Sequence, residues 1–241
     1  MVRSLTPRYA VLRVVVLATA LVVACSSNSQ EPGVKSAPTR PSVAASPGPT
    51  VTTPSRRPQE TSTSQRNVHE AREAHAATLL EDGRVLITGG LGTFGPISSV
   101  EVYDPAKDTW NTGPNMSQSR VGHSATLLRD GRVLIVGGTD EIGNISSTEL
   151  YNPATGSLTE TGSLLVARTS HTAILLRDGR VLIAGGNGLL GVVSSAELYT
   201  PSTATWTRSG NMVLPRAGHT ATLLDDGSVL VAGGGDGFFK Q

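Results

Sequence analysis

The chain repeats itself with a fixed step of 48 residues, and this repeat limits what it can fold into. The stretch from His123 to Gly138 reads HSATLLRDGRVLIVGG, and copies of it occur one step before it and one and two steps after it. A tandem repeat of this kind builds similar units that bury apolar surface against their neighbours. The repeated positions are Arg72, Arg120, Arg168 and Arg216; His75, His123, His171 and His219; and the doublets Gly89 and Gly90, Gly137 and Gly138, Gly185 and Gly186, Gly233 and Gly234.

Within one unit the local signals predict four short β-strands joined by turns. Strands are expected at 125–128, 133–136, 147–151 and 157–159. Asp130 and Gly131 predict a two-residue hairpin turn between the first two strands, in which both central residues have positive φ. The segment 133–136 is wholly apolar instead of alternating, as is typical of a strand covered on both faces. Each sheet is therefore expected to lie between two neighbouring sheets.

A glycine doublet followed by a Tyr and then a Trp, in a repeat of about 50 residues, resembles the kelch motif. The matching residues are Tyr103, Tyr151 and Tyr199, then Trp110 and Trp206, with Leu158 in place of the Trp in the second unit. The resemblance implies an all-β fold, in which four-stranded blades pack around the axis of a β-propeller. Blades are expected at about 67–114, 115–162 and 163–210, with a partial blade at 211–241.

This division gives about 3.5 blades, whereas closed propellers contain 4–8. We therefore expect an open arc, whose ends expose apolar blade faces and a strand edge. One explanation is that the sequence is a truncated reading of a longer kelch protein. The alternative is that a separate partner chain completes the propeller.

The first 24 residues have the features of an export signal. Arg3, Arg8 and Arg13 precede an apolar run at 14–24, which is shorter than the ~20 residues that a spanning helix needs. The run ends in LVVAC, which resembles the lipobox of bacterial lipoproteins. The resemblance implies a signal peptide at 1–24, a lipid anchor on Cys25 and a place on the extracytoplasmic side of the bacterial cell envelope. A plain secretory signal with an incidental Cys25 is the alternative.

Residues 25–66 consist mostly of Ser, Thr, Pro, Gly, Ala and Gln. Such a segment cannot bury enough apolar surface to offset the entropy of ordering, so we expect a disordered tether between the lipid and the propeller. From residue 66 onward, thirteen Lys and Arg stand against seventeen Asp and Glu, a net charge of −4. This balance, without a basic run or clustered aromatic side chains, argues against a nucleic-acid partner.

The repeated His residues could suggest a metal site, but their pattern favours a structural role. A His at the same place in every unit, three residues after an equally periodic Arg, is interpreted as a hydrogen-bonding residue between blades. Metal ligation would also need partners that orient the ligands, and none is identifiable. The same structural interpretation applies to the acids two residues before each repeated Tyr, which are Glu101, Glu149 and Glu197. No metal and no cofactor is expected.

The repeated Arg residues lie in the connection between the last strand of one blade and the first strand of the next. The kelch resemblance places this connection at a ligand-facing end. Arg72, Arg120, Arg168 and Arg216 are therefore candidates for a ring that contacts an anion, with a tie between adjacent blades as the alternative. Only one of the variable loops after the doublets carries charges, and its Asp140 and Glu141 are further candidates for a ligand contact.

Three classes of function remain open. The first is a binding module for a glycan, a peptide or a partner protein, since a propeller presents loops on a rigid ring and no catalytic set of residues stands out. The second is a fragment of a carbohydrate-active enzyme of the epimerase type known on kelch propellers. A copper-radical oxidase such as galactose oxidase is excluded, because its cofactor needs a cysteine and Cys25 lies outside the repeats. The third is a structural scaffold of an envelope assembly.

Overall fold

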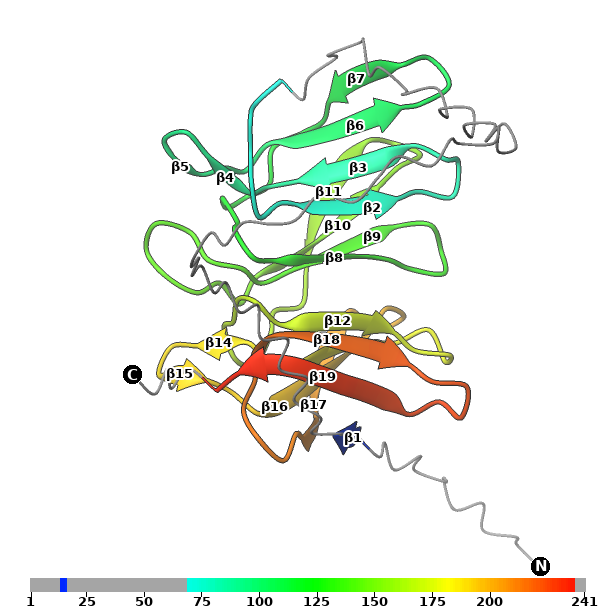
Figure 1. Ribbon diagram of the computed structural model, residues 1–241. Helices are drawn as coiled ribbons and strands as arrows, with labels where there is room; N and C mark the ends of the chain where they lie inside the picture. Colours follow the sequence, from blue (N-terminus) through cyan, green and yellow to red (C-terminus); the bar gives the residue numbers. More distant parts are fainter. Residues whose placement is uncertain (1–13, 17–68, 237–241) are drawn as a thin grey trace, which may run out of the picture. The chain divides into compact units, whose positions relative to one another are not determined.

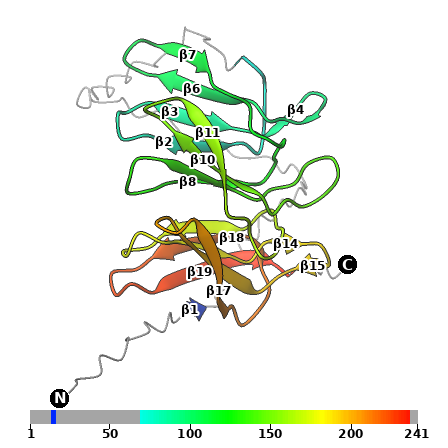
Figure 2. The same cartoon turned by 180° about the vertical axis from the view of Figure 1, so that it is seen from behind.

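The computed structural model describes residues 14–16 and 69–236. Its regular elements are β-strands. Three four-stranded antiparallel sheets follow one another along the chain, and a hairpin follows them (Figure 1, Figure 2). Within the described part, no helix is long and apolar enough to cross a membrane. The expected signal peptide at 1–24, except residues 14–16, lies outside the described residues, as do Cys25 and the tether at 25–66.

Each complete sheet is a meander in which strands adjacent in the sheet follow one another along the chain. The first sheet comprises β2 (Ala76–Leu79), β3 (Val85–Thr88), β6 (Val100–Asp104) and β7 (Thr109–Thr112). The second comprises β8 (Ser124–Leu127), β9 (Val133–Val136), β10 (Thr148–Asn152) and β11 (Ser157–Thr161). The third comprises β12 (Thr172–Leu175), β13 (Val181–Ala184), β16 (Ser195–Thr200) and β17 (Thr205–Asn211).

The remaining strands belong to a hairpin and two small ribbons. The hairpin comprises β18 (Ala217–Leu223) and β19 (Val229–Gly235), and β1 (Val14–Val16) pairs with β19 in parallel. The ribbons follow the first and third glycine doublets, and they comprise β4 (Leu91–Gly92) with β5 (Gly95–Pro96), and β14 (Asn187–Gly188) with β15 (Gly191–Val192).

Hydrophobic clusters between successive sheets form the core. All four residues of β9 are buried, and their side chains alternate between two clusters. Val133 and Ile135 pack with residues of the first sheet, whereas Leu134 and Val136 pack with residues of the third. Full burial of such a side chain contributes about 1.5–3 kcal/mol. The wholly apolar strand is therefore explained by a sheet on each side, as the sequence predicts.

The hairpin between the first two strands of a sheet differs from the predicted two-residue turn. The amide of Gly131 donates to the carbonyl of Leu128 at 3.1 Å, and the amide of Leu128 donates to the carbonyl of Arg132 at 2.8 Å. The loop thus has three residues, and of these only Gly131 has a positive φ, 79°. The prediction that Asp130 also has a positive φ is wrong. Its carboxylate instead accepts the Arg132 amide at 3.1 Å, and the bond from Gly131 to Leu128 closes the turn that ends in the left-handed glycine.

The repeated Tyr and Trp face each other across the third and fourth strands. Tyr103 opposes Trp110 and Tyr199 opposes Trp206, with ring centroids 5.0 and 5.1 Å apart. In the second sheet the partner of Tyr151 is Leu158, which packs against the cluster shared with the first sheet. An aliphatic side chain there keeps a cross-strand apolar contact in the absence of the Trp.

Candidate binding face

The connections between strands gather at two opposite ends of the sheets. The hairpins with the Asp-Gly pairs lie at one end, and the loops after the glycine doublets lie at the other (Figure 1). The connections between sheets share the second end, because the Gly90 amide donates to the Arg120 carbonyl at 2.8 Å and the Arg120 amide donates to the Ile97 carbonyl at 3.1 Å. We call this end the loop face. It comprises the loops 91–97, 139–145 and 187–193 and the connections 113–120, 162–168 and 210–216.

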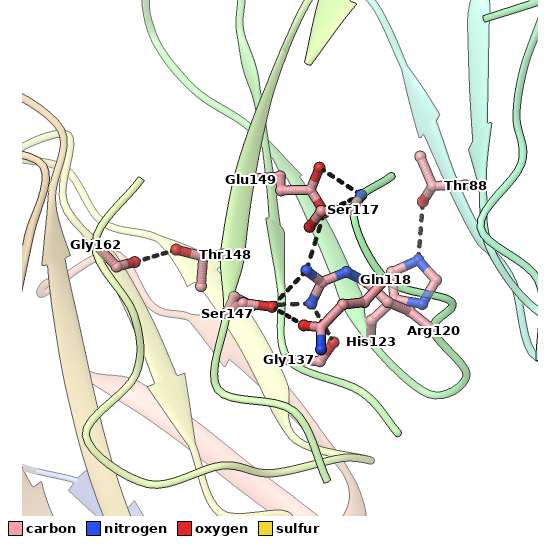
Figure 3. A network of polar contacts seen from close by, with 10 residues as sticks. All are labelled: Thr88, Ser117, Gln118, Arg120, His123, Gly137, Ser147, Thr148, Glu149 and Gly162. Carbon is pink, nitrogen blue, oxygen red and sulfur yellow. Dashed lines mark hydrogen bonds and ion pairs between the residues drawn. The ribbon is translucent and has the colours of Figure 1, made fainter. Parts of the chain in front are cut away.

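Arg120 lies beneath the loop face, and its side chain has no exposed surface (Figure 3). Its guanidinium donates to the carbonyls of Gly137 and Ser147, each at 2.9 Å, and to the Glu149 carboxylate at 3.0 Å. Arg72 and Arg168 make the equivalent contacts with Gly89, Ser99 and Glu101, and with Gly185, Ser195 and Glu197. Each of these Arg side chains therefore joins the second and third strands of its own sheet.

The backbone of the repeated Arg connects adjacent sheets. The carbonyls of Arg120, Arg168 and Arg216 accept the amide of the second glycine of the preceding doublet at 2.8, 2.9 and 2.7 Å. Burial lowers the pKa of Arg120 and Arg168, an effect that their Glu partners oppose, but an arginine is basic enough to remain charged. Since the side chains of Arg72, Arg120 and Arg168 are at most 1% exposed, three candidates for the anion-contacting ring are enclosed.

Arg216 holds the equivalent position at the β18–β19 hairpin with fewer partners. Its Nη1 atom donates to the Gly233 carbonyl at 2.6 Å, as Arg168 donates to Gly185 at 3.0 Å. Its Nε atom is buried without a hydrogen-bond partner. Within residues 69–236 no carboxylate lies in ion-pairing distance of Arg216, so its charge is not compensated there by a Glu as in the three complete sheets.

The Glu partners also hold the connections that enter the sheets. The Glu149 carboxylate accepts the amide and the hydroxyl of Ser117 at 3.2 and 3.1 Å (Figure 3). In the first sheet, burial opposes the charged form of Glu101, but hydrogen bonds from His69 and the charge of Arg72 hold its pKa below the usual value. These carboxylates therefore fix internal geometry, and their bonds leave them little capacity for acid or base catalysis.

Buried and half-buried His residues form hydrogen bonds with hydroxyl groups of the preceding sheet. The pairs are His123 with Thr88, His171 with Ser124 and His219 with Thr172, each with Nε2 2.9 Å from the hydroxyl oxygen. Ser124 and Thr172 begin the first strand of a sheet. In the first sheet Ala76 fills that place, and its cross-strand partner Thr88 supplies the hydroxyl instead. The contact is thus kept although the residue that provides it changes.

The same histidines are held in the neutral form. Burial, with a smaller contribution from the nearby Arg120, lowers the pKa of His123 to about 4, and burial with Arg168 lowers that of His171 to about 3. His75, the first of the series, is exposed. Among residues 14–16 and 69–236, no three His, Cys, Asp or Glu side chains are grouped so as to hold a metal ion.

The two acids of the loop 139–145 have different surroundings. The Asp140 carboxylate accepts the amides of Ile142 and Gly143 at 2.8 and 2.9 Å, so it shapes its own loop. Glu141 is exposed, and its Oε1 atom lies 3.2 Å from the position that a Cβ would take on Gly95 in the preceding loop. Of these two candidates, Glu141 is therefore the one available at the surface.

Exposed apolar side chains lie on the loop face, at positions that were not among the candidates predicted from the sequence. Phe94, Ile142 and Leu190 are 99%, 96% and 99% exposed, and they lie 48 residues apart at the same place in successive loops. We call them the loop tips. Further exposed apolar side chains at this face are Leu91, Leu165, Leu189, Val213 and Leu214. Soluble proteins rarely leave a large apolar patch exposed unless it serves binding. An apolar residue recurring within otherwise variable loops was the signal available in the sequence.

Comparisons with known proteins match this architecture. The family model described as the kelch motif matches residues 82–117, from the first hairpin into the following connection. The solved structure titled "Structure of YjhT" is similar with a TM-score of 0.53. The fold is that of a kelch-type β-propeller. The two chains share 18% sequence identity, and the similarity covers 62% of this chain and 54% of the other, so the present chain spans about half of that structure. No curated protein matches the sequence.

The hairpin end of the kelch blades carries two small clefts. They have volumes of about 220 and 260 Å³ and occupy equivalent places between adjacent blades. Arg180 and Arg84 line them, and each is paired with the Asp two residues before it at 2.7 Å. Charges at these clefts are thus largely compensated locally, and most of the apolar side chains that are strongly exposed lie at the opposite end.

Proposed function

We propose that this chain is a binding module whose loop face docks onto an apolar surface of a partner protein or peptide. The repeated loop tips carry this proposal. Phe94, Ile142 and Leu190 stand on separate loops of a rigid set of blades, and burial of each against a partner contributes about 1.5–3 kcal/mol. Rigid presentation reduces the entropy lost on binding.

The chemistry of the loop face favours a protein or peptide over a glycan. Glycan recognition depends on polar groups that satisfy hydroxyl groups, whereas the loop tips are apolar and the Arg side chains of the three complete blades are enclosed. Glu141 adds a negative charge beside the loop 91–97. We therefore expect the partner surface to combine apolar side chains with a basic side chain. No catalysis is proposed, because the buried acids and histidines are bonded within the blades.

We further propose that the module is attached to the bacterial envelope by a lipid on Cys25. The charged start, the short apolar run and the lipobox-like LVVAC support this attachment, and the tether at 25–66 separates the blades from the membrane. Growth with radiolabelled palmitate should label the parent protein, and the Cys25→Ser variant should lose the label. Label that survives in the variant would contradict lipid attachment at this residue.

Site-specific photo-crosslinking tests the loop face as the binding surface. A photoreactive side chain placed at Phe94, Ile142 or Leu190 should crosslink to the same envelope protein, whereas one placed at Ala154, an exposed residue of a turn at the opposite end, should not. Replacing all three loop tips with Ser should abolish capture by an affinity tag on this chain.

A glycan array serves as the second arm of this experiment. Saturable glycan binding that the triple Ser variant retains would overturn the proposal in favour of a carbohydrate-binding role. Crosslinking that is equal at the two ends of the blades would equally contradict it. Thermal melting of the triple variant should match that of the parent, because the three side chains make no buried contacts.

A further inference from the structure

The two clefts at the hairpin end have the same frame but opposite unpaired charges. The first cleft lies between the first and second blades, and the second cleft lies between the second and third. Each Asp that lines them is paired with the Arg two residues later. The pairs are Asp82 with Arg84, Asp130 with Arg132 and Asp178 with Arg180, each at 2.7 Å. One further charged side chain remains in each lining, which is Glu81 in the first cleft and Arg129, one 48-residue step later, in the second.

Arg129 lies across the hairpin of the third blade. Its Cδ and Nε atoms are 3.4 and 3.6 Å from the position that a Cβ would take on Gly179, and its Nη2 atom donates to the Arg177 carbonyl. Among the residues that the structure describes, no carboxylate forms an ion pair with Arg129. Arg177, at the same position in the third blade, instead has the Asp225 carboxylate 3.5 Å away. The guanidinium of Arg129 is therefore held at the cleft while most of its N–H groups stay available.

The turn between the third and fourth strands of the third blade adds hydroxyl groups to the second cleft. Thr200 and Ser202 of this turn line the cleft. Asn152 and Ala154 take their places in the first cleft, so that the serine hydroxyl is replaced by a methyl group. The second cleft thus combines an unpaired guanidinium from one blade with two hydroxyl groups from the next.

We propose that the second cleft is a binding site for a phosphate group, either inorganic phosphate or a phosphate carried by a sugar. A guanidinium binds phosphate through two parallel charged hydrogen bonds. A phosphate group offers three acceptor oxygens, so it can also accept hydrogen bonds from Ser202 and Thr200 while it is bound to Arg129. The carboxylates of the lining oppose such an anion little, because each is paired with its own Arg.

The size and the place of the second cleft fit this ligand. Its volume of about 220 Å³ is below the ~300 Å³ at which pockets for drug-sized ligands begin, so it holds one small charged group. The cleft lies at the opposite end of the blades from the loop tips. Phosphate binding here therefore does not depend on the binding role proposed for the loop face.

Nuclear magnetic resonance of the ¹⁵N-labelled full chain tests the site with inorganic phosphate as the probe. Phosphate is titrated at neutral pH and constant ionic strength, with chloride as the balancing anion. We expect the backbone amide signal of Gly179 to shift and saturate, whereas that of Gly131, the equivalent residue of the first cleft, stays unchanged. Arg129→Gln should weaken the affinity about tenfold, and Arg177→Gln should leave it unchanged. Glu81→Arg should make Gly131 respond as well, because it gives the first cleft the charge of the second.

Equal shifts at Gly131 and Gly179 in the parent chain would overturn the proposal, and so would a Gly179 signal that chloride shifts as much as phosphate does. Affinity that Arg129→Gln leaves unchanged, or a Gly131 signal that stays unchanged in Glu81→Arg, would also overturn it. The comparison of the two glycines uses the unmodified chain, so it decides the question even if a variant does not fold.

Glucose 6-phosphate, titrated beside glucose, identifies the source of the phosphate group. Tighter binding of glucose 6-phosphate than of inorganic phosphate supports the site with a sugar phosphate as its ligand. Equal or weaker binding supports the site with inorganic phosphate as its ligand. Glucose that shifts Gly179 to the same extent as glucose 6-phosphate would overturn the proposal, because the phosphate group would then contribute nothing to binding.

Discussion

Acidification from pH 6.5 to 4.5 is expected to weaken the fold through the histidines whose pKa the fold lowers. Burial lowers the pKa of His123 to about 4 and that of His171 to about 3, whereas the value in an unfolded chain is about 6.5. Over this range the unfolded chain binds a proton at each of these residues and the folded chain does not. The free energy of unfolding therefore falls as the pH falls.

The magnitude follows from the linkage between protonation and folding. A His whose folded pKa lies far below 6.5 loses about 1 kcal/mol of stabilisation between pH 6.5 and 5.5, and slightly more between pH 5.5 and 4.5. His123 and His171 together thus give a loss of about 4–5 kcal/mol, to which His219, with a lowered pKa, adds. Ordinary carboxylates titrate near pH 4, so this window reports mainly on histidine. Urea denaturation at four pH values measures the effect.

Two variants separate titration from packing. His171→Gln should reduce the pH dependence by roughly half of the two-histidine effect. Ser124→Ala removes the hydroxyl that bonds to His171 and should lower stability by about 1 kcal/mol at each pH above 5, with the pH dependence retained. A free energy of unfolding that stays constant from pH 6.5 to 4.5, or a slope unaffected by His171→Gln, would refute the reasoning.

Further expectations concern glycines and the buried ion pair. Gly137→Ala should lower the free energy of unfolding by more than about 3 kcal/mol, because a Cβ would lie 2.6 Å from the Arg168 carbonyl oxygen. Gly156→Ala, at a similar φ with open space around it, should lower it by about 1 kcal/mol. Denaturant midpoints compare the two variants. Glu197→Gln should cost about 3–5 kcal/mol, because it leaves a fully enclosed guanidinium without its charge partner, and a smaller change than 1 kcal/mol would contradict this. Gly131→Val should lower the melting temperature, since a β-branched residue resists a φ of 79°, by a free energy of about 1 kcal/mol or more; an equal melting temperature would count against the turn.

Strand positions could be predicted because the repeat shows which residue types occur at the same strand position in several units. The buried run 133–136 matches β9 in both bounds. The turn type could not be predicted, because an Asp-Gly pair fits both a two-residue loop and a three-residue loop that ends in a left-handed glycine. The difference depends on whether Leu128 pairs with Arg132, which is a matter of register between strands.

The candidate site was less predictable than the fold. A periodic Arg is compatible with an exposed ring or an internal ion pair, and the distinction depends on Glu149 reaching Arg120 from a strand 29 residues away. The loop tips were not predicted, because charged residues were taken as the candidates for ligand contact within the variable loops. Phe94 and Ile142 carry no charge, and their exposure becomes evident only when the loops are seen to project from the sheets.

The bond between each repeated Arg carbonyl and the preceding glycine doublet has a consequence for how such chains change in evolution. It recurs at three junctions with lengths of 2.8, 2.9 and 2.7 Å, so the angular step from one blade to the next is set by the same backbone contact each time. Both members of that contact lie inside the 48-residue period. Duplication of one period in the gene therefore copies a complete junction along with the blade. A longer propeller can then arise without new side-chain contacts between adjacent blades.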